Sequence, residues 1–351
     1  MATDRSTASS SRALNAILPL IAAGQPYEAH QKARTFASRY VKSNQFDTAI
    51  DVLFQSAREL LKAGQQGSGT DLASFLLDVY ESKGEVVNEE SRGRITQLLA
   101  LVGSSASWRK TIIDKAVAWS SRNGPCPAGD PDLQHYIGEL LYKDGLFDAA
   151  EPHLLAAGKR DSARLLAQMF VKWATTGGTP GTFALRGTVP YLLNGNILAA
   201  RAFTSEFVSQ ITASQPSLIS PLQSAPITLG SSKDTEPDEI IFTTDPCLNF
   251  TQLAVCTCQR AQREKNKAIR EAWVRLCGTY QSKGGILATK DVRKALSEIA
   301  DLYFAIPPPR AQPANPLGDM FSAMLGGSAT QSTPTRRILS PAPSVSSPGL
   351  D

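Results

Sequence analysis

The spacing of apolar residues along the chain predicts a succession of amphipathic helices. Between residues 24 and 80, three such patterns follow one another, with apolar side chains recurring at i, i+3, i+4 and i+7. Each predicted helix therefore has one face to bury, and its opposite face, which carries charged residues, is a candidate contact surface. The apolar positions are Phe36, Ala37, Tyr40 and Val41; Ile50, Leu53, Phe54, Ala57, Leu60 and Leu61; and Leu72, Phe75, Leu76, Val79 and Tyr80.

Helical patterns continue on both sides of this stretch. A helix is expected from Arg12 to Ala22, and the motifs GQPYEAH (24–30), NQFDTAI (44–50) and GLFDAAE (145–151) mark irregularly spaced helix starts with a Gly or Asn followed by an aromatic residue. Short helices with short connections predict an all-α fold, a right-handed α-solenoid of degenerate helical hairpins. The further helices are expected over 89–102, 108–120, 133–142, 149–155, 162–173, 248–265, 268–280 and 289–304.

Changes in composition divide the chain into four parts. Residues 1–10 are expected to be a disordered N-terminus, 11–150 an N-terminal helical half, and 151–306 a C-terminal helical half. The second half contains a Ser/Pro-rich insertion at about 214–246, where two β-compatible runs predict a small hairpin or loop. Residues 307–351 are rich in Pro, Ser, Gly and Ala and are expected to form a disordered tail, in which NPLGDMFSAML (315–325) is the only candidate contact element.

Composition narrows the possible functions. Hydrophobic residues make up 42% and charged residues 19%, as in ordinary soluble proteins, and the net charge of +4 lacks the concentrated basic footprint of a nucleic-acid binder. The N-terminus has no apolar stretch typical of a signal peptide, and no apolar run is long enough to span a membrane. Five cysteines without secretory context fit a reducing compartment, so a cytosolic protein is expected.

Motifs for catalysis or metal binding are missing from the sequence. His30, His135 and His153 have no metal-binding spacing, and Cys256 and Cys258 would point about 200° apart on a helix, which prevents joint ligation. No nucleophile elbow, phosphate-binding loop or dinucleotide fingerprint occurs. We therefore expect a non-enzymatic protein without cofactor or metal, the alternative being an enzyme whose site is assembled across the fold.

Two aspartates on the predicted helix after residue 70 have competing explanations. Thr70 has the side chain of a helix N-cap, and Asp71 would then lie in the first turn, where a carboxylate is favourable. This structural role accounts for Asp71 as well as a contact role does. It does not account for Asp78, which lies two turns further along the same side.

Several segments resemble a known family. YEAHQKARTFASRY (27–40), FDTAIDVL (46–53) and GQQGSGTDLASFLLDVY (64–80) resemble the α-solenoid adaptor of the Golgi-to-ER traffic (GET) pathway, which delivers tail-anchored membrane proteins. The likeness continues through 135–155, 248–261 and 299–309. It implies a cytosolic scaffold whose N-terminal helices dock on the homodimeric targeting ATPase and restrain its hydrolysis. The C-terminal helices and the insertion would bind a ubiquitin-like protein, which recruits a co-chaperone carrying the client.

The resemblance also implies functional residues. Matching positions for ATPase binding are His30, Arg34, Arg39, Asp71 and Asp78. The segment from residue 12 to 23 departs from the family, because Arg12 is its only basic residue. A general helical-repeat scaffold that binds peptides in a concave groove is the alternative. For the ubiquitin-like partner, we expect contacts from apolar residues in excess of what a terminal repeat needs, some of which periodicity also assigns to the core: Ile240, Phe242, Phe250, Leu253, Leu302, Phe304 and Ile306.

Overall fold

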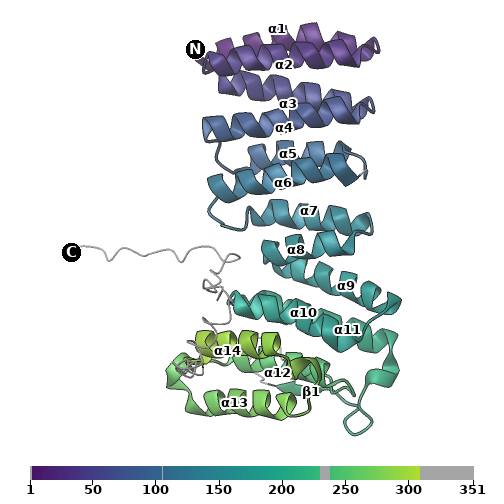
Figure 1. Ribbon diagram of the computed structural model, residues 1–351, viewed down its shortest axis with the longest axis vertical. Helices are drawn as coiled ribbons and strands as arrows, with labels where there is room; N and C mark the ends of the chain where they lie inside the picture. The colour runs from purple at the N-terminus through teal and green to yellow at the C-terminus, as the bar shows by residue number, and fades with distance from the viewer. Residues whose placement is uncertain (1, 105, 230–237, 309–351) are drawn as a thin grey trace, which may run out of the picture. The chain divides into compact units, whose positions relative to one another are not determined.

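The computed structural model describes residues 2–104, 106–229 and 238–308, which form fourteen α-helices and one two-stranded antiparallel sheet (Figure 1). The predicted all-α architecture of helical hairpins is confirmed. The chain divides into two compact units, the first ending at Lys159 and the second beginning at Arg160. This division falls after helix α8 (Phe147–Ala157) and not at residue 150, because α8 packs against helix α7 (Pro131–Lys143).

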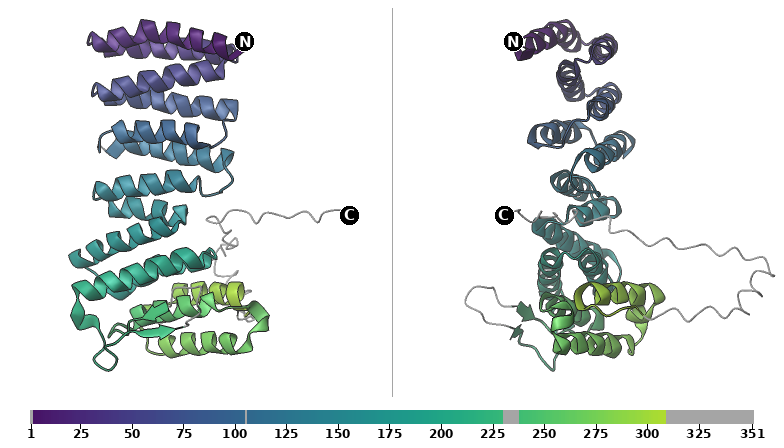
Figure 2. Two further views of the ribbon diagram at one scale, coloured as in Figure 1. Left: turned by 180° about the vertical axis from the view of Figure 1, so that it is seen from behind. Right: turned by 90° about the vertical axis from the view of Figure 1, so that its left-hand side faces the viewer.

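The first unit is a stack of antiparallel helices in chain order (Figures 1 and 2). The repeated Gly or Asn of the sequence motifs has a backbone role here, because Gly24, Asn44 and Gly145 all have positive φ, at 72°, 56° and 78°, in the turns between helices. Besides α7 and α8, the helices are α1 (Ala2–Ala22), α2 (Pro26–Lys42), α3 (Phe46–Lys62), α4 (Gln66–Lys83), α5 (Glu89–Leu101) and α6 (Ala106–Asn123).

The predicted start of the first helix at Arg12 is wrong. Helix α1 begins at Ala2, so residues 2–10 are helical where a disordered N-terminus was expected. No Gly or Pro interrupts this segment, and the hydroxyl of Tyr40 on α2 donates a hydrogen bond of 3.1 Å to the backbone carbonyl of Ser9. The contact with α2 therefore supports a segment whose composition alone suggested disorder.

Burial follows the predicted faces on α3 and α4 but not on α2. Leu53, Leu60, Leu72 and Leu76 are fully buried, as expected from periodicity. On α2 the buried residues are three alanines one turn apart, whereas the larger apolar residues Phe36, Tyr40 and Val41 are only half-buried. Small side chains at the contact let the neighbouring helices approach closely. The larger residues of α2 then lie at the edge of this helix contact and not at its centre. The three alanines are Ala29, Ala33 and Ala37.

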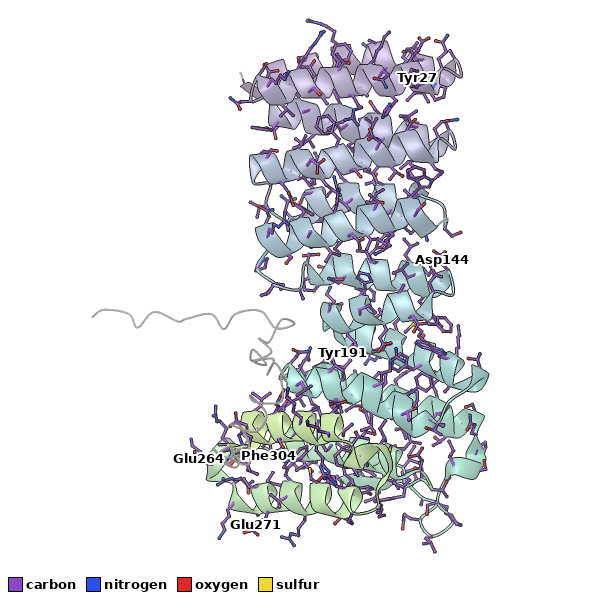
Figure 3. All side chains as sticks on the ribbon, viewed as in Figure 1. Tyr27, Asp144, Tyr191, Glu264, Glu271 and Phe304 are labelled. Carbon is purple, nitrogen blue, oxygen red and sulfur yellow. The ribbon has the colours of Figure 1, made fainter. Side chains whose placement is uncertain are left out.

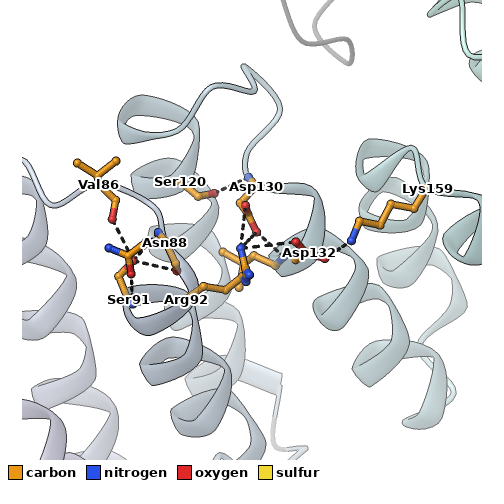
Figure 4. A network of polar contacts seen from close by, with 9 residues as sticks. Val86, Asn88, Ser91, Arg92, Ser120, Asp130, Asp132 and Lys159 are labelled. Carbon is orange, nitrogen blue, oxygen red and sulfur yellow. Dashed lines mark hydrogen bonds and ion pairs between the residues drawn. The ribbon is translucent and has the colours of Figure 1, made fainter.

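A polar network ties α5, α6 and α7 together (Figure 4). Asp130 is the N-cap of α7, and its backbone N–H donates to the hydroxyl of Ser120 on α6 at 3.1 Å. Arg92 on α5 lies 3.3 Å from a carboxylate oxygen of Asp130 and 3.5 Å from one of Asp132. Asp132 also pairs with Lys159 at the end of the unit. Successive hairpins are thus linked by charged hydrogen bonds as well as by apolar packing.

The second unit surrounds an aromatic core and contains the predicted β-insertion. Strands β1 (Ile227–Leu229) and β2 (Asp238–Ile240) pair with Ile227 opposite Ile240. The helix expected over 248–265 ends earlier, at Gln259. The tail from residue 309, including 315–325, lies outside the described residues. The remaining elements are helices α9 (Arg160–Thr176), α10 (Pro180–Leu193), α11 (Ile197–Ser214), α12 (Pro246–Gln259), α13 (Lys267–Gln281) and α14 (Lys290–Phe304), with short 3₁₀ turns at Pro216–Leu218, Arg263–Lys265 and Gly285–Ala288.

Candidate docking surface on helices α2 and α4

Three of the predicted contact residues form one polar cluster across α2 and α4. His30 and Arg34 lie one helical turn apart on α2, and both reach the same carboxylate oxygen of Asp71 on α4. The distance from Nε2 of His30 to Oδ2 of Asp71 is 2.7 Å, and Nη1 of Arg34 also donates to that oxygen. The guanidinium of Arg34 lies 5.5 Å from the ring centroid of Phe75. The cluster is therefore a defined structure and not a set of freely mobile surface charges.

Asp71 is ionised within this cluster. Partial burial alone would raise the pKa of its carboxyl group, but the hydrogen bonds from Arg34 and His30, together with their charges, outweigh burial and lower the pKa. The side chain of Asp71 keeps 42% of its surface exposed, so one carboxylate oxygen can still face a partner protein.

The predicted N-cap role of Thr70 is wrong. Helix α4 begins at Gln66, and Thr70 lies inside it with 2% of its surface exposed and a hydroxyl that has no partner among the described residues. The preceding glycines do not break the helix. A Cβ at Gly69 would lie 2.5 Å from Cγ of Leu61, so glycine is required there for α4 to pack against α3. Asp71 is thus outside the first turn, and its pairing with α2 replaces the cap as its structural role.

Arg39 lies on the same helix as Arg34 but is not part of the cluster. Its side chain is exposed and has no ion pair within the part of the chain that the structure describes. With Arg34 and Lys42 it lines a shallow depression of about 320 Å³, into which Thr35 and Ser38 also face. This face of α2 therefore presents unneutralised positive charge next to the cluster.

Asp78 is paired with a residue that the sequence analysis did not single out. Its Oδ1 lies 2.7 Å from Nζ of Lys115 on α6, and both side chains are exposed. One turn further along α4, Glu81 pairs with Arg122 of α6 at 2.5 Å. The polar face of the helix predicted over 108–120 already contained Lys115, but only the stacking of α6 against α4 brings it to Asp78. Asp71 and Asp78 share one side of α4, yet they pair with different neighbours.

The residues expected to bind the ubiquitin-like partner fall into two groups. Ile240, Phe250 and Phe304 are buried, with exposed fractions of 2%, 1% and 0%, so their side chains belong to the core of the second unit. The other four are half-buried and keep apolar surface accessible. These four are Phe242, Leu253, Leu302 and Ile306.

Neither a metal site nor a membrane-spanning helix is found among the described residues. In residues 2–104, 106–229 and 238–308, no group of three or more His, Cys, Asp or Glu side chains is arranged to hold a metal ion. Among the helices of those ranges, none is both long enough and apolar enough to cross a membrane. Burial raises the pKa of the Cys256 and Cys258 thiols on α12, which fits small packing residues better than reactive ones.

The chain is similar to known proteins both in sequence and in structure. The family model for Golgi to ER traffic protein 4 matches residues 43–325. Golgi to ER traffic protein 4 of Aspergillus fumigatus is 35% identical over 327 residues, covering 89% of this chain and 88% of that protein. The protein of the same name from Schizosaccharomyces pombe is 30% identical over 304 residues, or 86% and 91% of the two chains. The crystal structure of C. therm. Get4 has a TM-score of 0.76 and 32% identity, and the match covers 93% of this chain and 99% of that one.

Proposed function

The chain belongs to the Golgi to ER traffic protein 4 family, and from that premise we propose that it is a non-enzymatic cytosolic adaptor of the GET pathway. In this proposal it bridges the homodimeric ATPase that targets tail-anchored proteins to a ubiquitin-like protein. Through the latter it brings in a co-chaperone that carries the client. Handover of the client then becomes effectively intramolecular, which raises its rate without any new contact to the client. The adaptor also restrains ATP hydrolysis by the ATPase.

The observation that carries the proposal is the cluster of His30, Arg34 and Asp71. In the proposal, the N-terminal half of the chain docks on the ATPase through this cluster together with Arg39 and Asp78. Both signs of charge occur on one surface, and such patterning favours specific partners and fast association. The ion pairs hold His30 and Arg34 in place before docking, so less side-chain entropy is lost on binding.

The second unit supplies the other binding surface. The half-buried residues Phe242, Leu253, Leu302 and Ile306 contact the ubiquitin-like partner in this proposal. The buried residues Ile240, Phe250 and Phe304 act indirectly, by holding β2, α12 and α14 in shape. An apolar surface at the end of a helical array is favourable for a stable complex because a terminal repeat has no neighbour of its own to cover it.

Two variants of the full-length chain, each expected to weaken binding of one partner only, test the proposal. Variant Arg39→Glu should weaken binding to the ATPase and leave binding to the ubiquitin-like protein unchanged, whereas Leu302→Asp should do the reverse. Each partner is purified and its dissociation constant is measured by calorimetry, and circular dichroism checks that both variants are folded. If each variant weakens both partners equally, or neither partner binds the unaltered chain, the two-surface adaptor is refuted.

A further inference from the structure

Helix α4 has a stripe of small and acidic residues on its outer side. Its members are Gly67, Asp71, Ser74 and Asp78, at positions i, i+4, i+7 and i+11 of the helix. Asp71 pairs with α2 and Asp78 pairs with α6, and their side chains keep 42% and 57% of their surface exposed. The stripe therefore faces outward between α2 and α6, and the surface that we propose for docking continues onto α6.

The side of α6 that meets α4 begins with an exposed aromatic residue. Three residues spaced seven apart contact α4, and Lys115 and Arg122 do so through the ion pairs described above. The first of the three, Trp108, lies over Gly67, where an added Cβ would be 3.6 Å from two carbon atoms of the indole ring. Trp108 nevertheless keeps 43% of its surface exposed. A large apolar surface thus adjoins the polar stripe of α4.

The start of α6 is held in place by the residue that follows Trp108. Arg109 is buried, and its Nε donates a hydrogen bond of 3.2 Å to the carbonyl of Val102, just after α5. Its guanidinium also pairs with Asp144, in the turn before α8. Figure 3 shows Asp144 at the same end of the helical stack as Tyr27, near the start of α2. Trp108 is therefore fixed before any partner binds, and an anchor of this kind loses little freedom on binding.

Two explanations for Trp108 can be compared. Packing of the indole ring on Gly67 accounts for the contact between α6 and α4, but it leaves the exposed part of the ring unexplained. A partly exposed Trp beside ion-paired Arg34 and His30 has the composition of an interface centre, where Trp and Arg are enriched and contribute most of the binding free energy. The second explanation accounts for both the contact and the exposure.

We propose that Trp108 is the apolar anchor of the ATPase-docking surface, and that an apolar side chain of the ATPase packs on the exposed part of its indole ring. This inference rests on the proposed docking through α2 and α4, and it adds α6 to that surface. The charges of α2 speed association because they act over a distance. The indole ring acts only at contact, so it slows dissociation.

The association and dissociation rates of the full-length chain with the purified ATPase test this division of roles. Trp108→Ala should raise the dissociation rate about tenfold or more and change the association rate by less than about twofold, at low and at high ionic strength. The matched control is Val86→Ala, at an apolar residue that is 64% exposed and lies beyond the opposite end of α4. It should leave both rates unchanged. Urea unfolding measures the stability of each variant.

A second variant covers the indole ring without removing it. Gly67 lies within α4, and a Cβ there would be at an ordinary contact distance from the ring, so Gly67→Gln should fold and place its side chain over Trp108. It should raise the dissociation rate about fivefold. Gly93→Gln is the control, because a Cβ at this position of α5 would meet no atom within 4 Å. This control should dissociate at the rate of the unaltered chain.

The possible failures can be told apart. If Trp108→Ala and Gly67→Gln both dissociate at the rate of the unaltered chain, the anchor is refuted while docking through α2 stands. If Trp108→Ala dissociates faster but is also less stable, and Gly67→Gln behaves as the unaltered chain, Trp108 supports the fold and the anchor is again refuted. Failure of the proposed function looks different, because the unaltered chain then does not bind the ATPase.

Discussion

The carboxylate of Asp71 on α4 lies 2.7 Å from the imidazole of His30 on α2. Arg34 reaches the same oxygen from one turn further along α2. One acidic side chain thus holds two basic ones in place on the surface that we propose for docking. Ion pairs of this kind are screened by water, and Asp71 and Arg34 keep 42% and 45% of their side chains exposed, so the pairing contributes about 1 kcal/mol at most.

The first prediction concerns acid stability. The pKa of Asp71 is lowered in the folded protein, so its contribution to stability is present above the unfolded pKa of about 4 and is lost as pH falls through the lower folded value. Urea unfolding at pH 5 and pH 3 should show a smaller loss of stability for Asp71→Asn than for the unaltered chain. Asp51→Asn, on α3, is the control and should follow the unaltered chain. An identical loss for Asp71→Asn would mean that the cluster does not stabilise the fold.

The second prediction separates two arginines of α2. Arg39→Glu should slow association with the ATPase roughly threefold to tenfold at low salt without changing the stability of the chain, because Arg39 has no ion pair in the described structure. Arg34→Glu should slow association and also lower stability by about 1 kcal/mol, since it sets a second carboxylate beside Asp71. Stopped-flow association and urea unfolding measure the two effects. Rates that stay equal from low to high ionic strength would count against electrostatic docking.

The third prediction concerns His153 on α8. Burial lowers the pKa of its imidazole to about 4, outweighing the nearby charge of Asp114, and Nδ1 is paired with the side-chain carbonyl of Gln134 at 2.6 Å. Between pH 6.5 and 4 the unfolded chain binds a proton that the folded chain does not, so stability falls as pH falls through this range. The total loss of stability is on the order of 3 kcal/mol.

Thermal unfolding between pH 7.5 and 4.5 checks this. His153→Gln should flatten the pH dependence, whereas His135→Gln, the matched histidine on α7, should leave it steep. Equal slopes for the unaltered chain and His153→Gln would mean that another group carries the pH dependence.

Much of the fold could be predicted from periodicity because α3 and α4 have broad apolar faces that are buried whatever their neighbours are. Prediction from the sequence failed where packing between helices determines which side chains are buried. Alanines at every fourth position of α2 form its closest contact, although larger residues beside them have the stronger periodic signal. Thr70 was predicted to be the N-cap of a helix, whereas the helix already includes Gly69, which makes room for Leu61. No local pattern distinguishes a glycine that ends a helix from one that lets two helices approach.

Only part of the candidate site could be predicted from the sequence, because some of its contacts depend on how the helices pack. The spacing of His30 and Arg34 puts them on one helix face, and this needs no knowledge of the fold. Their common partner Asp71 and the pairing of Asp78 with Lys115 depend on which helices become neighbours. A local explanation, the N-cap at Thr70, therefore took the place of a long-range one.

The fourth prediction distinguishes core from surface among two residues of α14. Phe304 is fully buried and stacks on Trp273 at 5.0 Å, so Phe304→Ala should cost about 3–5 kcal/mol of stability. Leu302 is half-buried, so Leu302→Ala should cost much less and should mainly weaken binding of the ubiquitin-like protein. Thermal unfolding and calorimetric titration measure the two properties. If Leu302→Ala destabilises as much as Phe304→Ala and binding is unchanged, Leu302 is a core residue and not part of a partner surface.

The last prediction asks whether holding the ATPase and restraining it are separate properties of this surface. Asp78→Lys should keep most of the affinity supplied by His30, Arg34 and Arg39 but should lose restraint of ATP turnover. The pair with Lys115, at 2.7 Å, complicates the single variant, because a lysine at position 78 would face another lysine. Both side chains are exposed, so the change in stability should stay below about 1 kcal/mol.

An exchange of charges resolves this complication. The double variant Asp78→Lys/Lys115→Asp restores an ion pair between α4 and α6 but moves the carboxylate to α6. If the position of the Asp78 carboxylate matters for hydrolysis, the double variant should remain unable to restrain turnover, and its dissociation constant should match that of the unaltered chain. If restraint returns in the double variant, the ion pair between the helices and not the carboxylate is what matters. If affinity and restraint fall in strict proportion in Asp78→Lys, the residue is an ordinary docking contact, and the separation of the two roles is wrong.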